Sequence, residues 1–163
     1  MGNSGVKPKE LFRSGAPLPD DWNKCMSAIV SDNSIVNCTD VKGRTPLHRA
    51  VIDKAPDSVI SLLLKYGIEN CSKKDKDGYI PLHYALCTWN LNTQNNTYRM
   101  LIDAYMEGLM CKTKTGLLPI HICVQHRGDI SIIKEIVEFY PDCVREMTKN
   151  TLPLHMAIDS KCS

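Results

Sequence analysis

Three stretches of the chain place apolar residues at the spacing i, i+3, i+4 and i+7, which puts four side chains on one face of an α-helix. The sets are Val59, Leu62, Leu63 and Tyr66; Tyr98, Leu101, Ile102 and Tyr105; and Ile133, Ile136, Val137 and Tyr140. Each set follows a shorter apolar stripe, of which Leu47, Ala50 and Val51 are the first example. The pattern predicts repeating units, each made of a short helix, a turn and a second helix.

A six-residue motif recurs in register with these stripes, and it begins as Thr45 and Pro46 in its first copy. Its proline suits the first helical position, where a missing N–H has no intrahelical partner to lose. Its histidine recurs after 35, 38 and 34 residues, so four of the five histidines in the chain lie in this motif. The motif prolines and histidines are Pro46, His48, Pro81, His83, Pro119, His121, Pro153 and His155.

These residues resemble the ankyrin repeat family, whose signature is a T-P-L-H-x-A motif at a period of about 33 residues. The resemblance covers about residues 38–163. It implies an all-α, ankyrin-repeat solenoid of helix-turn-helix repeats with β-hairpin-like loops at one edge. We expect a flexible tail at 1–18 and an ankyrin-repeat domain at 19–163. Within that domain we expect a capping helix at 20–31, repeats at about 40–74, 75–112 and 113–147, and a partial repeat at 148–163.

The motif threonine is kept only at Thr45, and Ile80, Leu118 and Leu152 replace it elsewhere. In the family this hydroxyl helps to cap the helix and contacts the motif histidine. Loss of an N-cap costs about 1 kcal/mol, so we expect the later units to be individually less stable. The last loop lacks a turn glycine, and we expect Asn150 to adopt the positive-φ conformation there.

Several local features predict where elements end. Gly67 and Gly108 closely follow an apolar stripe, as glycines at the C′ position of a helix do. The polar run 90–96 predicts a protruding loop between the two helices of the second repeat. The last unit has apolar residues such as Leu154 and Ile158 with little sequence after them to cover them. We therefore expect this segment to fray or to pair with something else.

Composition is that of an ordinary soluble globular protein, with 43% hydrophobic and 23% charged residues. The net charge of +2 demands neither nucleic acid nor an anionic membrane as a partner. The longest apolar runs are far shorter than a membrane span, and no apolar segment of a secretory signal follows Met1. Gly2 follows Met1, as in the N-myristoylation motif, but Val6 stands where that motif has Ser or Thr. We expect a cytoplasmic or nuclear protein.

Catalytic and cofactor motifs are missing from the sequence. The eight cysteines include no C-x-x-C pair, so the usual zinc and thioredoxin-type spacings are absent. Phosphate-binding glycine loops and the G-x-S-x-G nucleophile motif are absent as well. We expect no cofactor, no metal, no small-molecule substrate and no enzymatic activity.

One alternative is a Cys/His-based enzyme or metal site made of Cys87, Cys123 and His126. Cys123 precedes His126 by three residues on one predicted helix, which brings the two side chains to the same face. Buried cysteine is more often an inert small hydrophobe, and a solvated His126 facing the groove is the simpler interpretation. The resemblance favours a structural role for the motif histidines, which bridge adjacent loops in the family.

The resemblance implies a protein-protein interaction module that binds a partner protein through its concave face and hairpin tips. In the family, binding residues lie at the loop tips and on the exposed side of the first helix. The positions that match them here are Val41, Lys42, Arg44, Ile52 and Asp53 in the first unit, Lys76, Asp77, Tyr79, Thr88 and Trp89 in the second, and Lys114, Thr115, Leu117, Gln125 and His126 in the third. We expect Trp89, Tyr79 and Arg44 to contribute most. The lysines at the tips suggest a mildly acidic partner surface. A second alternative is a regulatory ankyrin segment of a larger multidomain protein.

Overall fold

The computed structural model describes residues 22–87, 96–148 and 150–159. The predicted tail 1–18, the candidate contacts Thr88 and Trp89, and nearly all of the predicted loop 90–96 lie outside these residues. The α-helices are α2 (Trp22–Ser31), α3 (Pro46–Ile52), α4 (Asp57–Gly67), α5 (Pro81–Cys87), α6 (Thr97–Ala104), α7 (Pro119–Gln125), α8 (Ile130–Phe139) and α9 (Pro153–Asp159). Four 3₁₀-helices connect them: η1 (Asn33–Asn37), η2 (Ile68–Cys71), η3 (Met106–Met110) and η4 (Pro141–Arg145).

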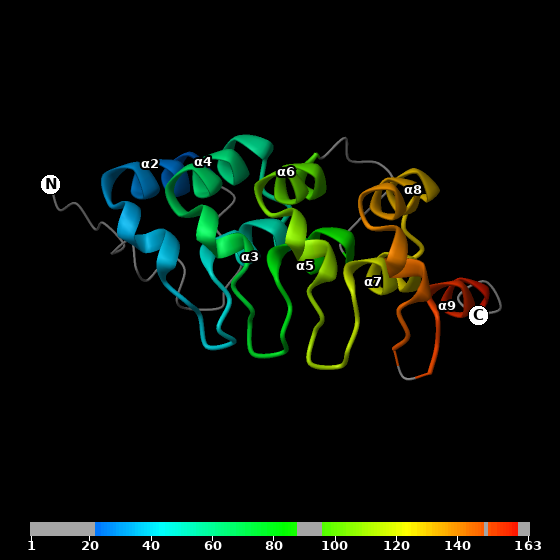
Figure 1. The fold of residues 1–163 in the computed structure, drawn as a ribbon. Helices are drawn as coiled ribbons and strands as arrows, with labels where there is room; N and C mark the ends of the chain where they lie inside the picture. The colour runs from blue at the N-terminus through cyan, green and yellow to red at the C-terminus, as the bar shows by residue number, and fades with distance from the viewer. Residues whose placement is uncertain (1–21, 88–95, 149, 160–163) are drawn as a thin grey trace, which may run out of the picture.

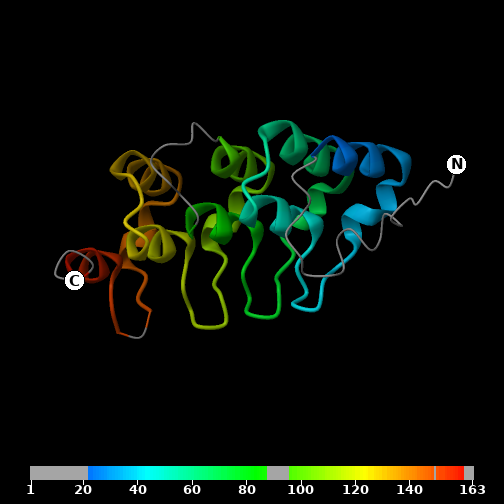
Figure 2. The same cartoon turned by 180° about the vertical axis from the view of Figure 1, so that it is seen from behind.

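The helices lie in two rows, and the array is elongated (Figure 1). Helices α3, α5, α7 and α9 form an inner row, while α2, α4, α6 and α8 form an outer row. Four hairpin-like loops project side by side below the inner row, and the reverse view shows the same order (Figure 2). This is the all-α solenoid that the repeated motif predicted.

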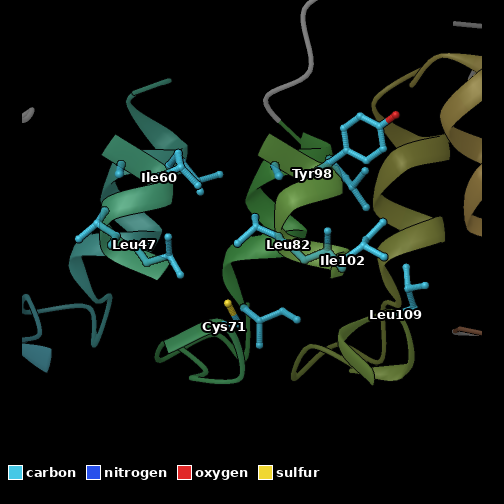
Figure 3. Close-up of a cluster of buried hydrophobic side chains, with 14 of the residues drawn as sticks. Leu47, Ile60, Cys71, Leu82, Tyr98, Ile102 and Leu109 are labelled. Carbon is cyan, nitrogen blue, oxygen red and sulfur yellow. The ribbon is translucent and has the colours of Figure 1, made fainter. Parts of the chain in front are cut away.

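The hydrophobic core is a continuous layer between the two rows. Leu47 and Leu82 of the inner row face Ile60 and Ile102 of the outer row, and all four side chains are buried (Figure 3). The predicted stripes supply Leu47, Leu82 and Ile102, whereas Ile60 lies next to the predicted stripe residue Val59. Each fully buried Leu or Ile contributes about 1.5–3 kcal/mol relative to an exposed one, so the stacking of neighbouring units stabilises the fold.

The prediction that Gly67 and Gly108 are C′ glycines is wrong. Gly67 has φ −159°, which is extended backbone that any residue adopts. A Cβ there would lie 2.5 Å from Nδ2 of Asn70 and 2.7 Å from Cγ2 of Val36, so close packing requires the glycine. Gly108 lies inside η3 and contacts the core. The prediction for Asn150 is confirmed, because its φ is +62°.

The apolar face of α9 is open to solvent. Leu154 is 68% exposed, whereas Leu82, at the same place in the second repeat, is 2% exposed because α7 covers it. Ile158 is exposed as well. The expected lack of cover over the last unit is therefore present, and the fraying of this segment stays a prediction.

Candidate binding surface

Each hairpin closes through its own backbone. In the second repeat the N–H of Asp75 donates to the carbonyl of Tyr79 at 2.8 Å, and the N–H of Gly78 donates to the carbonyl of Asp75 at 3.0 Å. Gly78 has φ +83°, and Gly43 and Gly116 have φ +76° and +82° at the equivalent places. Glycine reaches this region without a steric penalty, so its position fixes where each tip turns.

A buried polar side chain organises the first three hairpins from within. Oδ1 of Asp75 accepts hydrogen bonds from the backbone N–H groups of Asp77 and Tyr79, both at 2.9 Å. Oδ1 of Asp40 accepts from the N–H groups of Lys42 and Arg44 at 2.8 Å and 3.0 Å. Thr113 and Thr148 are the buried residues at this place in the other two hairpins. Our sequence analysis missed this position, although an Asp or Thr recurs three residues before each turn glycine.

The surroundings of Asp40 favour the charged form of its carboxylate. Burial by itself would raise its pKa, because a desolvated anion is disfavoured. The hydrogen bonds from the Arg44 side chain and from the N–H groups of Arg44 and Lys42 outweigh burial and lower the pKa of Asp40 below its ordinary value. The first hairpin is therefore held by an ionised side chain.

Neighbouring hairpins are joined to one another. The N–H of Lys76 donates to the carbonyl of Lys42 at 2.9 Å, and the N–H of Lys114 donates to the carbonyl of Asp77 at 3.0 Å. The hydroxyl of Thr148 donates to the carbonyl of Thr115 at 3.3 Å. These bonds join successive hairpins, which lie side by side in one row (Figure 2).

The motif histidines are structural in their geometry. In His83, Nδ1 accepts a hydrogen bond from the N–H of Ile80 at 3.1 Å, so the proton lies on Nε2, which donates to the carbonyl of Cys111 at 3.1 Å. His48 and His121 repeat both contacts. Burial lowers the pKa of His83 to about 4. With both nitrogens occupied and the ring buried, these side chains are poorly placed for proton transfer.

The structure changes the interpretation of the missing motif threonines. The hydroxyl of Thr45 lies 2.9 Å from Nδ1 of His48, as the resemblance implied. Where Ile80, Leu118 and Leu152 replace it, the N–H of that residue still donates to the histidine, at 3.1, 3.2 and 3.4 Å. The N–H of Thr45 donates to His48 in the same way, so the other repeats keep this bond and lack only the contact of the hydroxyl.

The predicted contact residues divide by exposure. Those with exposed side chains are Val41, Lys42, Lys76, Asp77, Lys114, Thr115, Gln125 and His126. Those partly covered are Arg44, Ile52, Asp53, Tyr79 and Leu117. The first set lies at the tips and at the end of α7, and it is the part of the predicted surface that solvent reaches most easily.

Two residues expected to dominate binding are engaged within the array itself. The guanidinium of Arg44 lies 2.7 Å from the carboxylate of Asp40, and the Arg44 side chain is only 11% exposed. Tyr79 packs against the rings of His83 and Tyr84, with centroid separations of 5.5 Å and 5.3 Å. The local sequence did not reveal these partners, because the aspartate and the aromatic rings belong to the hairpin base and the next helix.

One short contact joins two residues of the Cys/His site considered as an alternative, Cys87 and His126. Sγ of Cys87 lies 3.3 Å from Nε2 of His126, so His126 is exposed but also touches the preceding repeat. Cys123 is buried, and burial raises the pKa of its thiol to about 12. Burial also raises the pKa of Cys87, which disfavours the reactive thiolate.

Within residues 22–87, 96–148 and 150–159, no three His, Cys, Asp or Glu side chains gather as metal ligands would. In that same part of the chain, no helix has the length and apolar character needed to cross a membrane.

Stacked helix pairs with a row of linked hairpins define a solenoid repeat protein. A family model of three ankyrin repeats matches residues 21–108, and the chain belongs to the ankyrin repeat family. Ankyrin repeats are general modules for protein–protein interaction.

Two curated proteins share part of this sequence. The SMC5-SMC6 complex localization factor protein 1 of Bos taurus is 28% identical over 151 residues, which are 91% of this chain and 14% of that protein. The E3 ubiquitin-protein ligase KEG of Arabidopsis thaliana is 33% identical over 67 residues, 41% of this chain and 4% of that protein. The chain therefore spans only a small part of the length of these relatives.

Proposed function

We propose that the chain is a non-catalytic binding module that engages a partner protein through its hairpin tips and the exposed side of its inner helices. The observation that carries this proposal is the row of hairpins, which backbone hydrogen bonds hold at fixed spacing. A rigid row presents its side chains with little conformational entropy left to lose on binding. The buried, doubly bonded histidines support the non-catalytic part of the proposal.

Charge at the tips indicates the kind of partner. Lys42, Lys76 and Lys114 are exposed on three successive hairpins, with Asp77 as an acidic residue among them. An excess of cations along a linear row favours an acidic partner surface and accelerates encounter with it. The affinity should then fall as salt is raised, because salt screens exposed charges.

Affinity capture with charge-reversed variants tests this function. We would compare the wild-type chain with the triple variant Lys42→Glu, Lys76→Glu and Lys114→Glu for the proteins retained from an extract of the source cells. A matched control reverses three exposed lysines away from the tips, Lys24, Lys65 and Lys134. We expect a specific partner to be lost with the tip variant and kept with the control. Equal retention by both variants would contradict the proposed surface.

The length of the relatives supports a second proposal, in which the array is a regulatory segment that docks onto other domains of its own polypeptide. The chain covers 14% and 4% of the two relatives, which are far longer proteins. The mass of the endogenous protein, detected with an antibody against this array, discriminates the two proposals. A band much heavier than 18.3 kDa favours the regulatory segment.

A further inference from the structure

An apolar groove lies outside the tips and the inner helices. It encloses about 200 Å³ between η3 and the end of α8. Its lining residues are Met106, Glu107, Leu109, Met110, Phe139 and Tyr140. None of them belongs to the surface proposed above, so the groove is a separate feature of the molecule.

The groove exposes large apolar side chains next to one another. Met106, Met110 and Phe139 are 51%, 53% and 44% exposed, and buried Leu109 lies beneath them. Adjacent exposed apolar residues of this size mark interaction sites more often than scattered single ones do. Methionine is flexible and polarisable, so this wall can adapt to the shape of an inserted side chain.

The surroundings of the groove are negative. Glu107 lines it, and the exposed residues Asp103 and Glu138 occupy the last turns of α6 and α8. Both helices are described in full, and neither has a basic residue in its last turn. Their C-terminal carbonyls therefore add uncompensated negative dipole ends. Two exposed cations follow in the sequence, and each lies beside a carboxylate: Nζ of Lys112 lies 2.9 Å from Glu146, and Arg145 of η4 lies 3.9 Å from Asp142.

We propose that this groove docks a basic amphipathic segment of a partner protein, which inserts one large apolar side chain and places Lys or Arg beside Glu107. The volume suits a single anchor side chain, and the acidic rim complements basic flanks. The same charge disfavours an anionic membrane surface as the occupant. The groove thereby gives the array a second binding surface, independent of the hairpin tips.

Two labelled synthetic peptides test the proposal by fluorescence anisotropy. The first is a helical peptide of about 14 residues with Leu and Lys at amphipathic spacing and one central Trp. The second replaces every Lys with Glu. We expect the Lys peptide to bind the wild-type chain at least about tenfold more tightly than the Glu peptide. Equal binding of the two peptides, or binding of neither, overturns the proposal.

Matched variants locate the binding on the chain. Phe139→Ala should reduce the affinity for the Lys peptide by about tenfold or more. Ile130→Ala, on the same helix and at a side chain that is 64% exposed, should leave the affinity unchanged. Glu107→Gln should weaken binding and reduce its salt dependence, whereas Glu69→Gln in η2 should change neither. Both glutamates are exposed, so these two variants test the groove even if Phe139→Ala unfolds. Binding that no groove variant weakens overturns the proposal.

Discussion

Acid should unfold this protein through its motif histidines, and His83 is the clearest case. Its side chain is fully buried, Nδ1 accepts from the N–H of Ile80, and Nε2 donates to the carbonyl of Cys111. A proton added at Nδ1 would remove that acceptor and place a charge away from water. The folded chain therefore resists protonation that the unfolded chain accepts freely.

The magnitude follows from the pKa of His83, which burial lowers from 6.5 to about 4. Each pKa unit corresponds to 1.36 kcal/mol. Acidification from neutral pH to about pH 4 should therefore lower the free energy of unfolding by about 3 kcal/mol through this histidine alone. Between these two pKa values the unfolded state holds more protons than the folded state. The free energy of unfolding is therefore highest above pH 6.5 and decreases as the pH falls towards about 4. Burial lowers the pKa of His48 and His121 too, and both act in the same direction.

Urea unfolding followed by circular dichroism, at several pH values from about 7.5 to 4.5, measures this loss. The variant His83→Gln should be less stable at neutral pH but lose less stability on acidification. The variant His126→Gln provides a matched substitution at an exposed histidine outside the repeated motif. The carboxylate of Asp40 does not interfere, since its lowered pKa places its titration below this range. An unfolding free energy independent of pH, or an equal slope in His83→Gln, would refute the reasoning.

Three further predictions concern stability. Gly78→Ala should destabilise the protein more than Gly43→Ala in urea unfolding, because the new Cβ would lie 2.6 Å from the N of Lys114, whereas at Gly43 the nearest atom is 3.5 Å away. Both variants also lose about 1 kcal/mol or more because φ is positive. Equal losses in the two variants would argue against the close contact. Tyr84→Phe should cost about 1–3 kcal/mol, because its hydroxyl donates to buried Asp75 at 2.6 Å; an unchanged melting temperature would contradict this. Backbone amides of α9 should exchange hydrogen faster than those of α5, because Leu154 and Ile158 lie open to solvent; equal protection would show that α9 is as stable as the central repeats.

The repeats were predictable from the sequence because each one repeats the same physical constraints. The predicted stripe from Val59 to Tyr66 located the buried face of α4 in part, since Val59 and Leu63 are buried, and so is Ile60 beside them. The recurring proline marks where the inner helix begins. The ends of the outer helices were less predictable. Gly67 looked like a cap in the sequence, but Asn70 and Val36 crowd it, and Val36 comes 31 residues earlier in the chain.

The candidate surface was predictable only in outline. Which loops form the tips follows from the repeat, but the availability of each side chain depends on its neighbours in space. Arg44 is bound to Asp40, four residues earlier, and Tyr79 lies against a ring of the following helix. The groove beside Phe139 joins η3 to α8, about thirty residues apart in the chain, and no periodicity along the sequence encodes that proximity.

The contacts of the motif histidines give the array a direction. Each of three buried imidazoles donates to a carbonyl that comes 25 to 31 residues later in the chain: that of Tyr79 for His48, of Cys111 for His83 and of Glu146 for His121. The acceptor of His48 belongs to the next repeat, whereas those of His83 and His121 lie at the end of their own repeats. Removing residues from the C-terminal side would strip the acceptor from a histidine that remains, while removal from the N-terminal side would not. Truncations of equal length at the two sides should then differ in how acid-sensitive they leave the rest, so the order of assembly has a chemical polarity.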